Sequence, residues 1–196
     1  MTASTQTVLV SLLLSGVASV GCEQREPLPD LGTIPELALT DQEGRAFSSS
    51  DFSGKTSIVD FVFTSCPTIC PLLSHKMQQF QERLADAEGV QLVSISVDPE
   101  HDTPEVLHEY GERYGADPAR WRLLTGDATE VNRVVVRGFR VAMGEPEPAP
   151  GGGYDIMHSS TFVLVDTEGR IRGYYPNEPE GTAELLRDVD RLRTGR

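Results

Sequence analysis

The sequence SIVDFVFTSCPTICP (residues 57–71) joins an apolar run to two closely spaced cysteines. Residues 57–63 form an apolar, β-branched run, which is typical of a strand buried on both faces of a sheet. Apolar residues then recur with a helical period over residues 70–87. The stretch therefore predicts a strand, a short loop and a helix, with Cys66 in the loop and Cys70 at the start of the helix.

Strand and helix signals alternate through the rest of the chain, which indicates an α/β fold with a central mixed sheet flanked by helices. The predicted helices are residues 104–114, 128–137 and 180–192, and the predicted strands or extended segments are residues 90–97, 122–125 and 139–143 and a hairpin of residues 162–166 and 170–175. The segment EPEPAPGGG (residues 145–153) predicts a loop inserted before the hairpin, because neither helix nor sheet accommodates that density of proline and glycine.

The acidic turn DPEHDTPE (residues 98–105) leads into the predicted helix of residues 104–114. Asp102 or Thr103 can cap this helix, and Pro104 suits its first position. We interpret the turn as a marker of the fold.

The 196-residue chain carries a formal net charge of −13, and its length suits one domain with a single core. Binding to nucleic acid requires clusters of Lys and Arg that contact phosphates, and this chain lacks them. The charge pattern therefore excludes a nucleic-acid-binding protein.

The first 22 residues contain no charged side chain, and their apolar run, residues 8–20, is too short to span a bilayer as a helix. This pattern predicts an export signal, and ASVGC, ending at Cys22, resembles a bacterial lipobox in which the cysteine is lipidated. A plain signal peptide or an uncleaved membrane anchor is the alternative. Residues 23–34 then predict a proline-rich tether and residues 35–196 the folded domain. We expect an exported protein, tethered on the oxidising periplasmic face of a membrane.

Cys66 and Cys70 are predicted to lie at a helix N-terminus, where backbone N–H groups and the helix dipole lower the pKa of a thiol. Their spacing leaves room for either a disulfide or joint coordination of one metal ion. A purely structural disulfide or two inert core thiols is the alternative. The surrounding prolines, Pro67 and Pro71, and the turn from strand to helix favour a functional pair.

One of the four histidines differs from the others in its position along the chain. We interpret His75, His101 and His108 as exposed polar residues. His158 immediately precedes a predicted strand, and in a thioredoxin-like sheet the loop entering that strand faces the cysteine loop; a strand-capping histidine is the alternative. Two thiolates and one imidazole form a trigonal set suited to Cu(I), whereas a closed zinc site requires a fourth ligand. The neighbouring Met157 is a further soft donor, but we interpret it as a core residue.

Three motifs, in this order, resemble the Sco (SenC) copper proteins, a family with a thioredoxin-like fold that assists cytochrome c oxidase assembly. They are FTSCPTICP (residues 63–71), SVDPEHDTP (residues 96–104) and HSS (residues 158–160). The resemblance covers most of the chain after about residue 35. Ser65 and Met157 depart from the family pattern, since a histidine or aromatic residue is frequent at the first position and an acidic residue at the second.

The resemblance implies that Cys66, Cys70 and His158 bind copper, as Cu(I) or Cu(II), and that the two cysteines also cycle to a disulfide. It implies a membrane-tethered metallochaperone that delivers copper to the binuclear copper site in the copper-binding subunit of cytochrome c oxidase. Other copper donors and thiol-disulfide proteins are further partners. The alternative is a thiol–disulfide oxidoreductase that reduces the cysteines of that oxidase site. A thiol peroxidase needs only one cysteine and would leave His158 without a role.

Overall fold

The computed structural model describes residues 26–66, 69–149 and 152–195. The predicted export signal, with Cys22 as its lipidation site, lies outside the described residues. Within the described part of the chain, no helix combines the length and apolar character needed to cross a lipid bilayer.

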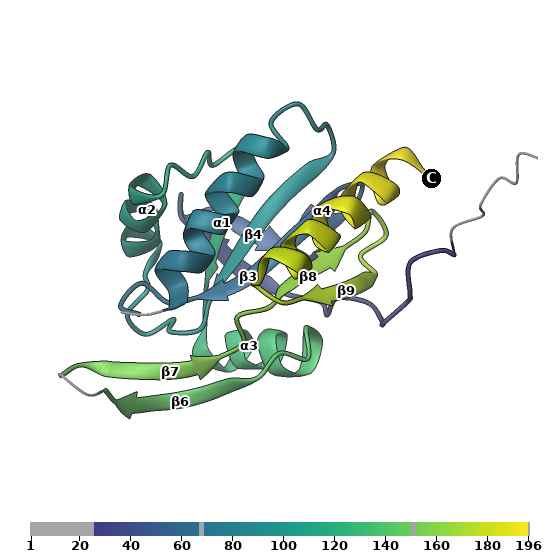
Figure 1. Ribbon diagram of the computed structural model, residues 1–196. Helices are drawn as coiled ribbons and strands as arrows, with labels where there is room; N and C mark the ends of the chain where they lie inside the picture. The colour runs from purple at the N-terminus through teal and green to yellow at the C-terminus, as the bar shows by residue number, and fades with distance from the viewer. Residues whose placement is uncertain (1–25, 67–68, 150–151, 196) are drawn as a thin grey trace, which may run out of the picture.

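Seven strands form one mixed sheet: β1 (Ala38–Asp41), β2 (Ala46–Ser48), β3 (Thr56–Val62), β4 (Val90–Ser96), β5 (Trp121–Thr125), β8 (Phe162–Val165) and β9 (Ile171–Tyr175). Their order across the sheet is β2-β1-β5-β4-β3-β8-β9. Figure 1 labels β4, β3, β8 and β9 of this sheet. The central strand β3 runs parallel to β4 and antiparallel to β8. The predicted α/β fold with a central mixed sheet is confirmed.

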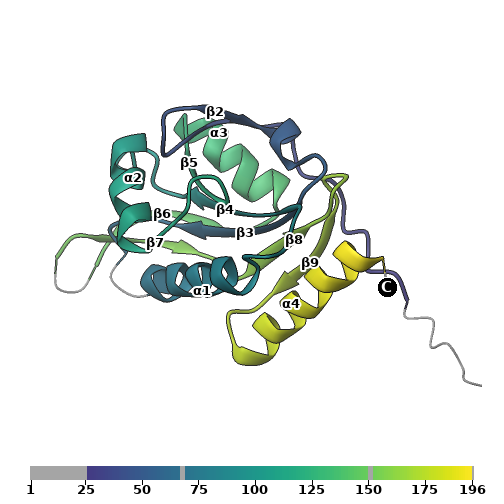
Figure 2. The ribbon, with the colours of Figure 1, turned by 90° about the horizontal axis from the view of Figure 1, so that it is seen from above.

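The helices are α1 (Ile69–Arg83), α2 (Pro104–Arg113), α3 (Ala128–Asn132) and α4 (Pro179–Thr194), with a 3-10 helix (Ser49–Phe52) and a π-helix (Arg133–Gly138). α1 and α4 cover one face of the sheet, and α3 lies on the opposite face (Figure 1, Figure 2). Thr103 is the N-cap of α2, since its side chain accepts from the Val106 N–H at 3.4 Å, and Pro104 opens the helix. This leaves the carboxylate of Asp102 available for other contacts.

All seven residues of β3 are buried, as expected for a strand paired on both sides and covered on both faces. Ile58, Val59 and Phe61 have no exposed surface. Asp60 is equally buried, and it lies directly opposite Ser94 of β4 in the register. A carboxyl group at the centre of an apolar sheet requires a specific explanation, because an isolated buried charge is costly.

Helix α1 ends at Arg83, four residues before the predicted end at residue 87. The carbonyls that follow the helix accept from a side chain of another part of the chain. The guanidinium of Arg120 donates to the carbonyls of Leu84 at 2.5 Å and Ala87 at 3.3 Å, and it also donates to that of Ala85. These contacts replace the helical hydrogen bonds that a longer helix would make.

The predicted loop at residues 145–153 is wrong in its first half. β6 (Met143–Pro148) pairs with β7 (Tyr154–His158) in a separate two-stranded antiparallel sheet, the ribbon (Figure 1). Prolines are tolerated in β6 because a strand with only one neighbour leaves one edge without ladder hydrogen bonds. The register also shifts between Met143 and Pro146, as in a β-bulge.

The predicted extended segment at residues 139–143 is also wrong, apart from Met143 at the start of β6. The π-helix continues the predicted helix of residues 128–137 as far as Gly138, and the chain then turns at Arg140, which has a φ of 54°. Gly138 packs so closely on Pro35 that a Cβ atom would lie 2.1 Å from the proline ring. This close approach requires glycine.

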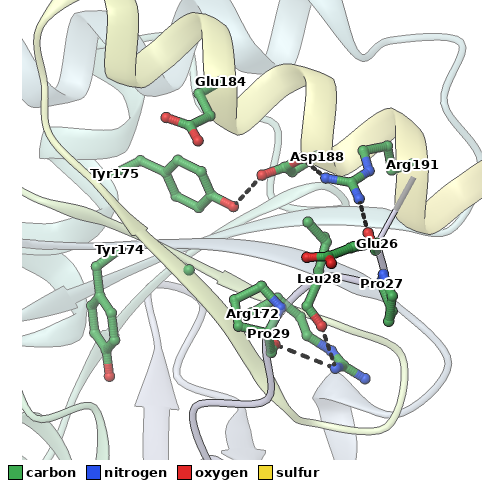
Figure 3. A pocket seen from close by; sticks show the side chains of 11 residues that line it. Glu26, Pro27, Leu28, Pro29, Arg172, Tyr174, Tyr175, Glu184, Asp188 and Arg191 are labelled. Atoms are coloured by element: carbon green, nitrogen blue, oxygen red, sulfur yellow. Dashed lines mark hydrogen bonds and ion pairs between the residues drawn. The ribbon is translucent and has the colours of Figure 1, made fainter. Parts of the chain in front are cut away.

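The N-terminal strap, which we define as residues 26–34, was predicted as part of a tether but contacts the folded body. Its contacts are Arg191 with the Glu26 carbonyl, Arg172 with the Leu28 and Pro29 carbonyls (3.3 Å each), Arg170 with the Asp30 carboxylate (2.5 Å) and Arg140 with the Leu31 carbonyl (3.0 Å). The strap backbone also bonds to the body, since the Leu31 and Ile34 N–H groups donate to the Ile171 and Gly169 carbonyls at 2.9 Å each. The strap, β9 and α4 line an open cavity of about 450 Å³. Figure 3 shows the side chains that line it.

We expect a chain shortened to residues 35–196 to be less stable than residues 26–196 by roughly 1–3 kcal/mol, because Leu28, Leu31 and Ile34 pack against the core. The melting temperature should fall by about 2–4 °C for each kcal/mol lost. Arg187→Ala, which changes an exposed arginine of α4, is the control and should leave the melting temperature unchanged. Equal melting temperatures for the two chain lengths would contradict a stabilising strap.

Candidate metal centre

Cys66 and Cys70 lie where β3 ends and α1 begins, as predicted. Both are thiols, with exposed fractions of 6% and 0%. The Cys70 backbone N–H donates to Cys66 Sγ, and the Phe63 backbone N–H donates to Cys70 Sγ, each at 3.4 Å. One backbone N–H at the start of α1 and one just after β3 therefore point at the sulfur atoms, an arrangement that favours thiolate character.

His158 ends β7 and reaches the same point from the ribbon. Its Nε2 lies 3.2 Å from Cys70 Sγ, and its Nδ1 lies 3.1 Å from the Ser159 carbonyl oxygen. A carbonyl only accepts hydrogen bonds, so Nδ1 carries the proton and the lone pair of Nε2 points toward the sulfur. Metal-binding histidines are commonly oriented in this way by a hydrogen bond from their second nitrogen.

The two Sγ atoms and the imidazole donor atom all lie within 4.8 Å of one another. The structure therefore brings together the three candidate ligands that were predicted from residues far apart in the sequence. His75 instead packs against Tyr114, His101 bonds to Asp98, and His108 bonds to Glu43. Their interpretation as exposed polar residues is confirmed.

The protonation of Cys70 differs from the expectation based on the helix dipole. The hydrogen bond with Cys66 and burial raise the pKa of the Cys70 thiol, although the Phe63 N–H opposes this shift. The expected lowering of the pKa at the helix N-terminus is therefore wrong for Cys70, because two adjacent buried sulfurs do not both ionise easily. A metal ion that binds both sulfurs must displace this proton, so its affinity should rise with pH.

Asp60 is a residue near the centre that the sequence analysis missed. Its Oδ1 accepts from the Ser94 hydroxyl at 2.5 Å, and Ser94 Oγ in turn accepts from Trp121 Nε1 at 2.9 Å. Its Oδ2 is buried without a hydrogen-bond partner among the described residues. Burial raises the pKa of Asp60 to about 7, and the interaction with His158 partly opposes the shift. The available signal was a lone acidic residue inside an apolar strand.

Asp102 supports the cysteine loop, although the sequence analysis treated its motif as a fold marker. Its carboxylate accepts from the Thr64 backbone N–H at 3.1 Å, the Thr64 hydroxyl at 2.6 Å and the Ser96 hydroxyl at 2.5 Å. Burial raises the pKa of Asp102, and these donors partly offset the effect. The acidic turn therefore positions the backbone two residues before Cys66.

Met157 is 64% exposed, so its interpretation as a core residue is wrong. Side chains alternate between the two faces of a strand, which places Tyr154, Ile156 and His158 on one face of the ribbon and Met157 on the other. The pleat therefore directs the thioether away from the face that carries the imidazole.

The donor set suits a soft, low-coordinate metal ion. Thiolates favour Cu(I), and imidazole binds copper as well. A closed tetrahedral zinc site uses four protein ligands, whereas the cluster found among the described residues contains three. The residues present therefore fit copper.

Comparison with known proteins agrees with this geometry. A family model described as SCO1/SenC matches residues 29–194. The chain belongs to the SCO1/SenC family. Within this family, the SCO1 protein homolog of Bacillus subtilis is 32% identical over 165 residues, which cover 82% of this chain and 83% of the homolog.

Solved structures of Sco proteins share the fold. Bradyrhizobium japonicum ScoI with copper bound is 29% identical, with a TM-score of 0.71 over 82% of this chain and 99% of that one. BsSco, described as a Sco-family cytochrome c oxidase assembly protein with a disulfide switch, is 27% identical, with a TM-score of 0.73 over 87% and 100% of the two chains. The predicted thioredoxin-like fold of the Sco family is confirmed.

Proposed function

We propose that this protein is a copper metallochaperone that binds copper through Cys66 Sγ, Cys70 Sγ and His158 Nε2. The observation that carries the proposal is the convergence of these three atoms within 4.8 Å, with the histidine tautomer that leaves Nε2 free to bind a metal. The copper-bound structure of a family member supports the choice of metal.

The chain's own residues prepare the site for binding and release. The imidazole is already oriented, and the two thiols give up their protons when copper binds, so both sulfurs act as anionic donors. Three ligands leave the ion accessible to an incoming thiolate. Binding is therefore expected to be tight and yet open to ligand exchange with a partner.

The recipient that we propose is the copper-binding subunit of cytochrome c oxidase, with other copper donors or thiol-disulfide proteins as further partners. The support is family membership and the assembly role stated for BsSco.

We also propose export to the periplasmic face and tethering through residues 1–22, with Cys22 as the lipidation site. Mass spectrometry of the membrane fraction tests the lipidation, and we expect a mature N-terminus at Cys22 that carries lipid. An N-terminus that is intact or cleaved elsewhere, with no lipid on Cys22, would contradict it.

The copper site is tested by titrating reduced residues 26–196 with Cu(I) against a competing chelator. We expect a one-to-one complex that His158→Ala weakens by at least the roughly 10–100-fold typical of losing only an outer partner of a ligand, since here a nitrogen ligand itself is lost. His75→Ala, an exposed histidine on α1, is the matched control and should bind like the wild type. Full affinity in His158→Ala would contradict the three-ligand site.

A second candidate function is thiol–disulfide exchange, because the two sulfur atoms lie within 4.8 Å of each other. Cys66 is the more exposed thiol, so its thiolate would attack a partner disulfide. Cys70 would then displace the partner's second thiol, leaving the partner reduced and Cys66 and Cys70 oxidised to a disulfide. Rapid turnover of a protein disulfide by the copper-free protein, unaffected by His158→Ala, would favour this function over the first.

A further inference from the structure

The copper ligands come from two parts of the structure that belong to different sheets. Both cysteines belong to the main body, whereas His158 lies on the ribbon. Among the described residues, the ribbon strands β6 and β7 pair only with each other. A two-stranded ribbon is marginally stable alone, so its position beside the cysteines depends on its contacts with the body.

Tyr154, the first residue of β7, makes a polar contact with the body. Its hydroxyl donates to Asp98 Oδ2 in the acidic turn of residues 98–105. Burial and the bond with Asp98 raise the pKa of Tyr154 to about 12, so the hydroxyl keeps its proton at neutral pH. Asp98 is only 4% exposed, and its Oδ1 accepts from His101 Nδ1 at 2.9 Å. Each oxygen of this buried carboxylate therefore has its own donor.

Aromatic rings continue the contact from Tyr154 to the metal ligands. The Tyr154 ring stacks on Phe63, with centroids 6.2 Å apart and an interplanar angle of 21°. Phe63 meets the imidazole of His158 edge to face at 5.8 Å, and its backbone N–H donates to Cys70 Sγ. On its other side, Tyr154 lies 5.2 Å from the ring of His101. A single residue, Phe63, thus contacts Tyr154 and the imidazole through its ring and one thiol through its backbone N–H.

The pleat of β7 makes Tyr154 and His158 act from the same face of the ribbon. They lie four residues apart, or about 13 Å along a strand, on the face that also carries Ile156. Ile156 is 2% exposed and packs in the core between them. A tilt of the ribbon about Ile156 would therefore move His158 whenever the end at Tyr154 detached.

We propose that Tyr154 is a positioning residue for the third copper ligand, because its hydroxyl holds the ribbon to Asp98 and so keeps His158 Nε2 beside Cys70 Sγ. The proposal rests on the copper site proposed above. Phenylalanine at this position keeps the ring contacts but leaves Asp98 Oδ2 without its donor, which would weaken the docking of the ribbon.

A double-mutant cycle in the reduced protein tests this role. Tyr154→Phe should weaken Cu(I) binding by about 10-fold, within the range found when an outer partner of a metal ligand is lost. In the His158→Ala background, the same change should have no further effect, since the ligand that Tyr154 positions is absent. Tyr174→Phe, which removes a tyrosine hydroxyl that donates to the Phe139 carbonyl, is the matched control and should not change the affinity. An equal loss in both backgrounds, or no loss in either, would overturn the proposal.

Hydrogen exchange of the copper-free protein separates this proposal from the copper function. Tyr154→Phe should accelerate exchange of the β6 and β7 amides by roughly 10-fold while leaving α1 and β8 unchanged, because only the ribbon loses a contact. Tyr174→Phe should not affect the ribbon. Unchanged ribbon exchange in Tyr154→Phe would overturn the positioning role, whatever the copper titration shows. Failure of the wild-type protein to bind Cu(I) would instead overturn the proposed function.

Discussion

Replacing Cys70 with serine is expected to lower Cu(I) affinity by more than roughly 100-fold, because losing an outer partner of a ligand alone costs about 10–100-fold. Serine nearly keeps the size of the side chain, but it exchanges a soft sulfur for a hydroxyl oxygen that stays protonated at neutral pH. Cys70 is completely buried, and its Sγ lies 3.2 Å from His158 Nε2. The change therefore removes the donor at the centre of the cluster.

The measurement is a chelator competition at neutral pH on the reduced protein, with thermal denaturation of the copper-free variant to show that it folds. Met157→Ser is the matched control, because it also exchanges sulfur for a hydroxyl one residue from a ligand. Met157 lies on the opposite face of the ribbon, so this variant should bind copper like the wild type. A Cys70→Ser variant that retains its affinity would exclude Cys70 as a ligand, and a weakened Met157→Ser would show that the thioether takes part.

The second large effect concerns Asp60 and the pH dependence of stability in the copper-free protein. The pKa of Asp60 is about 7 in the folded protein, against an ordinary value of 3.8. Below about pH 4 the carboxyl is protonated in both states. Between about pH 4 and 7 the folded protein keeps the proton and the unfolded chain releases it, so rising pH favours unfolding. This carboxyl should lower the free energy of unfolding by about 4 kcal/mol across that range, at about 1.4 kcal/mol per pKa unit.

Asp60→Asn should remove this part of the pH dependence, because the amide does not ionise. The amide oxygen can still accept from Ser94. The NH₂ group replaces the unpartnered Oδ2, and the resulting loss in the free energy of unfolding is the same at every pH. The measurement is urea denaturation at several pH values between 4 and 8. Asp86→Asn, which changes an exposed carboxyl, should keep the wild-type profile. If Asp60→Asn keeps that profile as well, the buried carboxyl is not the group that titrates.

Asp60 also connects stability to the metal centre. Its negative charge contributes to the raised pKa of Cys70 and interacts with His158. Ionising the carboxyl therefore makes it harder for the adjacent thiol to lose its proton. The same burial that makes an ionised Asp60 costly for folding also lets its charge act on the metal centre.

Much of the fold around the site was predictable because its signals are local. The apolar run before Cys66 predicts a buried strand, and the helical period after Cys70 predicts α1. Pro104 marks the start of α2, where a proline without an N–H costs nothing. Family membership and the three candidate ligands were also predictable, because their motifs are short and stand in a fixed order.

The features that were predicted wrongly or missed depend on contacts between distant residues. Arg120 ends α1 early, and pairing with β7 makes a strand of the proline-rich residues 143–148. Met157 is exposed because the pleat turns it away from the body. Local sequence patterns do not reveal these features. The partners of α1 and β6 lie more than five residues away in the sequence, and the exposure of Met157 depends on the register of a sheet.

For the metal centre, the sequence by itself determined which atoms are available: two thiols at the start of a helix and an imidazole before a strand. Only the tertiary structure decided that these atoms meet, that Ser159 fixes the histidine tautomer and that the pKa of Cys70 is raised. The physical reason is that side-chain identity is a local property. Desolvation, charge proximity and hydrogen-bond direction depend on which residues the fold packs together.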